Sequence, residues 1–125
     1  MRLNLTSNNR IRESDQQLMK RLAKECPRYF EGLKMPWFSP EGYVKMRAAA
    51  ADKDNLFDTF EEFEQNAIAH FDQAVADGHA TEKVMIDADA LIAWCIAERR
   101  PLDGIARQMF AAITVYEMED RAGHA

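Results

Sequence analysis

The clearest pattern in the chain is a helical repeat of apolar residues near its middle. Between residues 56 and 75 they recur at intervals of three, four and seven positions for about five turns, and Gly78 supplies a stop. Acidic residues occupy much of the opposite side, so the pattern predicts an amphipathic helix that packs through one face. Its apolar positions are Leu56, Phe57, Phe60, Phe63, Ala67, Ile68, Phe71, Ala74 and Val75.

Four further helices are expected around this one. Three of them begin at Ser14, Ser39 and Asp87, whose side chains can cap a helix N-terminus. The expected helices cover residues 14–26, about 12 residues from Pro40, residues 87–99 and residues 103–118. Short connections between them predict an all-α fold, a small single-domain bundle of four to five helices with a short N-terminal arm. One buried cluster is expected to hold Phe60, Phe63, Phe71, Trp94, Ile105 and Met109.

Two connectors between these helices carry their own signals. The segment from Pro27 to Pro40 includes three prolines, counting both ends, and four aromatic residues, so it is expected to cross the core surface with its rings inward. The connector from Thr81 to Ile86 could form a strand at residues 84–86. We expect an arm at residues 1–13, the helical domain at 14–120 and a tail at 121–125.

Composition is that of an ordinary soluble domain. Of the 125 residues, 47% are hydrophobic and 30% are charged, and no stretch approaches the roughly 18 apolar residues of a membrane span. The N-terminus also lacks the apolar core of a signal peptide. Cys26 and Cys95 fall in helical apolar patterns, where a thiol acts as a small hydrophobic group. The expected location is therefore cytoplasmic.

Charge is distributed unevenly along the chain. Residues 1–50 hold ten Lys and Arg against five Asp and Glu, residues 51–98 hold two against twelve, and the net charge is −5. One interpretation is that the basic part packs beside the acidic part, in the same subunit or in a partner subunit. The other is that the acidic part is exposed and attracts a basic partner.

The sequence contains no arrangement typical of an enzyme. No serine or cysteine has the surroundings of a nucleophile, and the five glycines are dispersed singly rather than gathered in a phosphate-binding loop. A calcium loop starting at Asp52 is excluded because Phe57 and Phe63 stand where glycine and a bidentate glutamate are needed. The three histidines lack metal-binding spacing. We therefore expect no catalysis, no cofactor and no metal ion.

Glu64 interrupts the apolar face of the central helix. At about 100° per residue it falls between Phe60 and Phe57, where a carboxylate is costly unless it is paired or hydrogen-bonded. One interpretation is an ion pair with a Lys or Arg of the first 50 residues. The alternative is a carboxylate in a cleft, which together with His70 would be the one opening for an enzyme.

Residues 91–112 loosely resemble a helix-turn-helix, with Arg107 and Gln108 outward and Arg99 and Arg100 at the break. The usual turn glycine is missing, and a sequence pI of about 5.2 opposes binding to phosphates. An ordinary helical hairpin explains the same residues. A regulator that binds DNA or RNA, through this segment or through the basic N-terminal part, is the alternative function.

Together these features predict a non-enzymatic, helical protein-binding regulator or inhibitor. Its acidic helix face would engage a basic partner, including a nucleic-acid-binding protein whose surface it covers. Part of the apolar surface of Trp37 and Phe38 could remain outside a small core, so a homodimer or another partner contact is expected there. The candidate partner-binding residues are Asp58, Glu61, Glu62, Asp72, Trp37 and Phe38.

Overall fold

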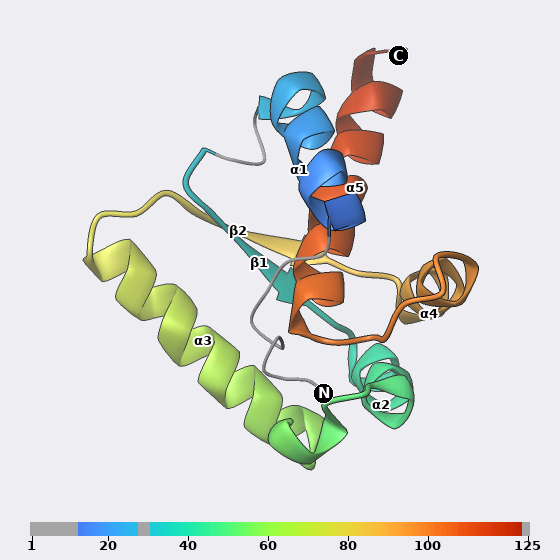
Figure 1. Ribbon diagram of the computed structural model, residues 1–125. Helices are drawn as coiled ribbons and strands as arrows, with labels where there is room; N and C mark the ends of the chain where they lie inside the picture. Colours follow the sequence, from blue (N-terminus) through green and yellow to red (C-terminus); the bar gives the residue numbers. More distant parts are fainter. Residues whose placement is uncertain (1–12, 28–30, 124–125) are drawn as a thin grey trace.

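The computed structural model describes residues 13–27 and 31–123 (Figure 1). Most of the expected arm therefore lies outside the described residues, and residues 121–123, expected in the tail, continue the last helix. The elements in chain order are α1 (Glu13–Glu25), β1 (Leu33–Trp37), α2 (Pro40–Ala49), the 3-10 helix η3 (Lys53–Asn55), α3 (Phe60–Ala76), β2 (Thr81–Met85), α4 (Ala88–Ala97) and α5 (Gly104–Gly123).

The fold is mixed α/β, so the expected all-α class is wrong. The two strands pair in parallel, and 67% of the described residues are helical. Each strand has only five residues, and α2 and α3 lie between them, so no hairpin turn marks the pair in the sequence. Pro36 within β1 also argues against a strand unless it lies at a sheet edge. Residues 84–86, which could form a strand by their sequence, lie only in part in β2, since this strand begins at Thr81 and ends at Met85.

The helices are arranged in layers around this small sheet. α3 lies on one face of the sheet, and α5 lies on the other face, with α1 packed on the far side of α5 (Figure 1). α2 and α4 pack together at the end of the sheet where both strands finish. In the described residues, no helix has both the length and the apolar character that crossing a membrane requires.

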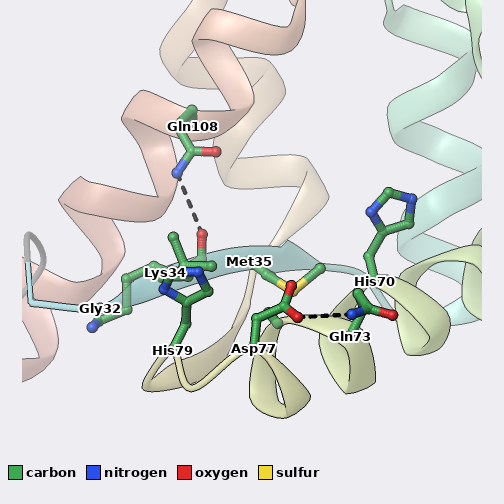
Figure 2. Close-up of a pocket in the computed structure, with 10 residues that line it drawn as sticks. Gly32, Lys34, Met35, His70, Gln73, Asp77, His79 and Gln108 are labelled. Carbon is green, nitrogen blue, oxygen red and sulfur yellow. Dashed lines mark hydrogen bonds between the residues drawn. The ribbon is translucent and has the colours of Figure 1, made fainter.

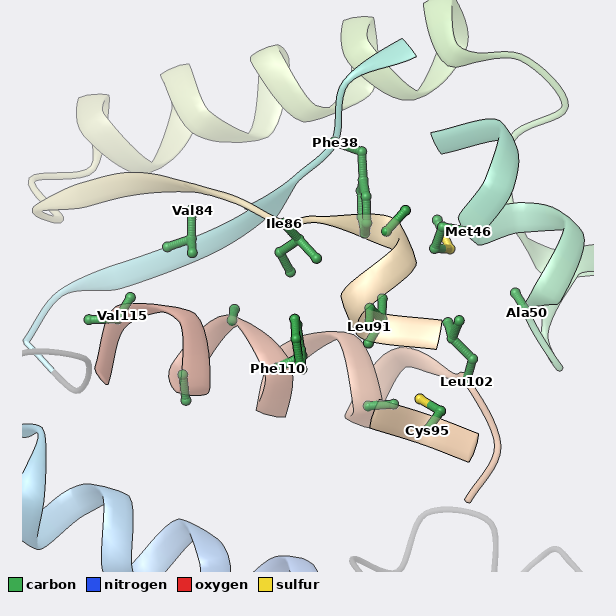
Figure 3. Close-up of a cluster of buried hydrophobic side chains, with 14 of the residues drawn as sticks. Phe38, Met46, Ala50, Val84, Ile86, Leu91, Cys95, Leu102, Phe110 and Val115 are labelled. Carbon is green, nitrogen blue, oxygen red and sulfur yellow. The ribbon is translucent and has the colours of Figure 1, made fainter. Parts of the chain in front are cut away.

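The hydrophobic core lies between α5, one face of the sheet, α2 and α4 (Figure 3). Of the expected core, Met109 is buried, whereas the five other residues are only partly buried. Phe60, Phe63 and Phe71 are only partly buried because α3 packs on the other face of the sheet, where Ala67 is its one buried residue. The largest fully buried side chains are instead Tyr43, Phe38, Met46, Leu91, Val115 and Cys26.

Side-chain caps determine where three of the helices begin. Ser39 Oγ accepts a hydrogen bond from the Gly42 N–H at 3.0 Å, and Asp87 accepts one from the N–H of Ala90, so these two expected caps are confirmed. The third, Ser14, is not the cap of α1, because it lies inside that helix. The central helix begins later than the apolar pattern indicates, because Thr59 Oγ1 accepts from the third N–H of α3 at 3.2 Å. Leu56, included in the expected helix, is extended.

Tyr43 links this core to the loop before α3, since its hydroxyl donates a hydrogen bond to the Phe57 C=O at 2.6 Å. Burial raises the pKa of Tyr43 above its ordinary value of 10.0. The folded chain holds this proton more tightly than the unfolded chain. The stabilisation is therefore complete below about pH 10 and is lost as the pH rises through the raised pKa.

Tyr43→Phe is expected to lower the free energy of unfolding by about 1 kcal/mol at neutral pH, because it removes this hydrogen bond. It should also make the fall in stability above about pH 10 shallower, because one titrating group is gone. Urea denaturation of both proteins across that pH range measures the two effects. Parallel pH profiles would contradict the assignment to Tyr43.

Candidate partner-binding surface

α3 is held to the rest of the chain along one side only, and its outer side is exposed. It carries four acidic residues and no Lys or Arg. Glu61 and Asp72 are exposed and lie about three turns apart on nearly the same line of the helix. Glu62 points to a different side and accepts a hydrogen bond from the Thr59 hydroxyl at 3.1 Å. The structure thus places two of the predicted acidic residues on one line.

Exposed apolar side chains lie beside that acidic line. Ile68 and Val75 are 42% and 52% exposed, and with Glu61, Glu64 and Asp72 they form a stripe at steps of three or four residues. Such a stripe runs along one flank of a helix. The flank therefore alternates between carboxylates and apolar groups.

β2 extends this flank. The Nζ of Lys83 lies 4.4 Å from the ring centroid of Trp37 and 5.3 Å from that of Phe71, which is on the same side of α3 as Ile68. Two residues further along the strand, Met85 is 59% exposed and shares this face of the sheet. We call the combined area the α3–β2 surface. It comprises Glu61, Glu64, Ile68, Asp72, Val75, Lys83 and Met85.

Among the described residues, three of the twelve carboxylates of residues 51–98 pair with cations of the basic part, as the first interpretation of the charge pattern expects. Asp58, predicted to bind a partner, forms an ion pair with Arg47 at 3.0 Å. Lys45 pairs with Asp89 at 3.2 Å, and the ammonium of Lys34 lies 3.8 Å from a carboxylate of β2. In the described part of the chain, no ion pair involves the three carboxylates of the α3–β2 surface, Glu61, Glu64 and Asp72.

Glu64 was expected to pair with a cation of the first 50 residues, and among the described residues no such pair is present. Its side chain is partly exposed at the edge of the apolar face. The last two cations of the first 50 residues, Lys45 and Arg47, pair instead with Asp89 and Asp58. Glu64 therefore contributes to the α3–β2 surface rather than to the core.

Trp37 and Phe38 are inside the chain's own fold. They are 5% and 2% exposed, and each ring packs edge-on against Phe63 with centroids 6.1 Å apart. The expected partner contact rested on apolar surface left outside the core, and the structure shows none at these two rings. The reason is that the Trp37 ring, at the end of β1, packs against Phe63 of α3, whereas Phe38 belongs to the core cluster.

The segment that resembles a helix-turn-helix uses most of its polar groups internally. Arg100 is buried and forms an ion pair with Asp15. Arg107 binds the carboxylate of Asp52 through both terminal nitrogens, at 3.1 Å and 2.6 Å. Gln108 donates to a backbone C=O of β1 at 3.4 Å. These side chains therefore hold the fold together instead of presenting a row of donors to nucleic acid.

A pocket of about 580 Å³ lies on the opposite flank of α3, against β1 (Figure 2). His70 and His79 line it, and Gln73 in its wall donates to the Asp77 carboxylate at 2.9 Å. In the described residues, no group of three or more His, Cys, Asp or Glu is placed to hold a metal ion. The lining offers polar contacts, but no nucleophile is paired with a base.

The comparisons with models of known protein families, with curated proteins and with solved structures found no match. The function is therefore argued from the geometry and charge of the α3–β2 surface. No single signal in the sequence marked the contribution of β2 to this surface, because Lys83 and Met85 become its neighbours only through the parallel pairing with β1.

Proposed function

We propose that the chain is a non-enzymatic protein-binding module whose α3–β2 surface docks on a basic partner protein and thereby regulates or inhibits it. The observation that carries the proposal is a surface that combines three exposed apolar side chains with three carboxylates, which form no ion pair with any described residue. Carboxylates attract and orient a basic partner, and apolar groups supply the contact area.

The exposed apolar side chains distinguish this surface from an ordinary solvated helix face. A helix that only covers the sheet gains nothing from presenting Ile68 and Val75 to water, whereas a docking helix buries them on binding. A basic surface that binds nucleic acid is one target of suitable charge, and covering it would make the chain a competitive inhibitor.

Reversing the charge of the stripe is expected to weaken partner binding by about tenfold or more, because like charges across an interface cost binding energy. The test variant is Glu61→Lys with Asp72→Lys. The matched control is Asp54→Lys with Glu98→Lys, which changes the net charge equally at exposed sites away from the surface.

The measurement uses full-length wild type and both variants, immobilised and exposed to an extract of the cells that naturally contain the chain. Proteins with basic surfaces should be captured by wild type and control and lost from the test variant. Capture should also weaken as salt is raised. Equal capture by all three proteins would overturn the proposal, and salt-sensitive retention of the chain on DNA or RNA would favour the nucleic-acid alternative.

A further inference from the structure

The two strands pair through alternate residues. The N–H of Leu33 donates to the C=O of Ala80 at 2.7 Å, and the N–H of Ile86 donates to the C=O of Trp37 at 2.8 Å. In a parallel pair, the N–H and C=O of one residue point to the same side, and that side alternates along the strand. The odd-numbered residues of β1 and the even-numbered residues of β2 therefore face the partner strand.

The outer edge of β1 is protected against further pairing. Lys34 and Pro36 direct their backbone groups to this edge, and proline has no N–H to offer. The C=O of Lys34 accepts a hydrogen bond from the side chain of Gln108 on α5 (Figure 2). Proline and side-chain cover are the devices by which natural sheets block an exposed edge.

Within residues 13–27 and 31–123, the outer edge of β2 has neither a proline nor a side chain that bonds to its backbone. Thr81, Lys83 and Met85 direct their N–H and C=O groups away from β1. In the part of the chain that the structure describes, no hydrogen bond reaches these backbone groups. Since Lys83 and Met85 are also exposed, this edge presents a row of donors and acceptors on which another strand can form.

The unprotected edge belongs to the α3–β2 surface. A strand added beside β2 would direct every second side chain toward the flank of α3. Two residues of a strand advance about 6.6 Å and four residues of a helix about 6 Å, so successive side chains would meet successive turns of α3. The groups they would meet are apolar at Ile68 and Val75 and acidic at Glu64 and Asp72.

We propose that the partner binds by adding an extended segment to the outer edge of β2, with apolar and basic side chains alternating on the side that faces α3. This inference rests on the proposed function and specifies the mode of binding. Main-chain hydrogen bonds hold such a strand, and its side chains decide specificity. The addition would extend a two-stranded sheet, which is marginal by itself, to three strands.

The test uses the full chain and a synthetic ten-residue peptide that alternates arginine and valine. Amide hydrogen exchange followed by NMR should show the Lys83 and Met85 amides slowed by about tenfold or more at saturating peptide. The same peptide with N-methyl groups on alternate residues should leave their exchange unchanged, because it keeps the charge and loses the strand-pairing N–H groups. A peptide alternating glutamate and valine should not bind.

A matched pair of variants tests the same edge from the side of the chain. Lys83→Pro removes an outward N–H, whereas Lys83→Ala keeps it, and both remove the ammonium over Trp37. Lys83→Pro should bind the Arg–Val peptide about tenfold more weakly than Lys83→Ala. If Lys83→Pro does not fold, the N-methylated peptide decides the question with the wild-type chain.

The outcomes separate this inference from the proposed function. The Arg–Val peptide could change the NMR chemical shifts of α3 residues and leave the hydrogen exchange of the Lys83 and Met85 amides unchanged. That result would overturn strand addition, while docking to α3 would stand. The absence of any binding by the Arg–Val peptide would also overturn strand addition. The capture experiment with the charge-reversed variants then decides independently whether the chain docks on a basic protein.

Discussion

Replacing Arg100 by alanine is expected to lower the free energy of unfolding by about 3–5 kcal/mol, one of the largest effects of any single substitution in this chain. The side chains of Arg100 and Asp15 are 2% and 6% exposed and form an ion pair between α1 and the turn before α5. The guanidinium also lies 5.2 Å from the Trp94 ring centroid. Removing it would leave the Asp15 carboxylate buried without its counter-charge.

A double variant distinguishes an unpaired charge from lost packing. Asp15 Oδ2 and Arg100 Nε are buried and have no hydrogen-bond partner among the described residues. The free-energy cost of removing these two charged groups from water is therefore only partly offset by their hydrogen bonds. Asp15→Leu combined with Arg100→Met should therefore recover most of the stability lost in Arg100→Ala. Equilibrium denaturation at neutral pH measures all three proteins. A loss below about 1 kcal/mol in Arg100→Ala would show that water reaches the pair.

The helices were predictable because their signals are local. Ser39 and Asp87 cap the helices that they were expected to cap, and the apolar period located α3 to within one turn. The strands were hidden because their pairing spans the whole α2–α3 crossover. A proline in β1 argues against a strand, and only the pairing register shows that Pro36 faces an outer edge where its missing N–H costs nothing.

The candidate site was also predictable in part, because some of its residues follow a local signal within one helix. The acidic side of α3 follows from helical period alone, which correctly placed Glu61 and Asp72 outside. Which carboxylates form ion pairs within the chain depends on the tertiary fold. The sequence therefore could not show that Asp58 is paired whereas Glu61 and Asp72 belong to the exposed surface. Charge count likewise gave no sign that Arg100 is buried, since burial of an arginine depends on a counter-charge 85 positions away.

Phe38→Ala is expected to lower the free energy of unfolding by about 3–5 kcal/mol, because it removes a buried ring and leaves a cavity. Phe38 lies in the cluster between the sheet, α2 and α4 (Figure 3). Its ring is also in edge contact with that of Phe63. A residue that anchored a partner instead would change binding and leave the stability of the isolated chain nearly intact. Urea denaturation with circular dichroism measures the loss.

Phe71→Ala is the matched control from the other side of the sheet and should cost only about 1–2 kcal/mol. Its ring is partly exposed beneath Lys83, so part of its surface is in water before the substitution and little cavity is created. The difference between the two variants measures how unequally the two layers contribute to stability. Equal losses would mean that α3 is packed as tightly as α5, and that the flank offered for docking is part of the core.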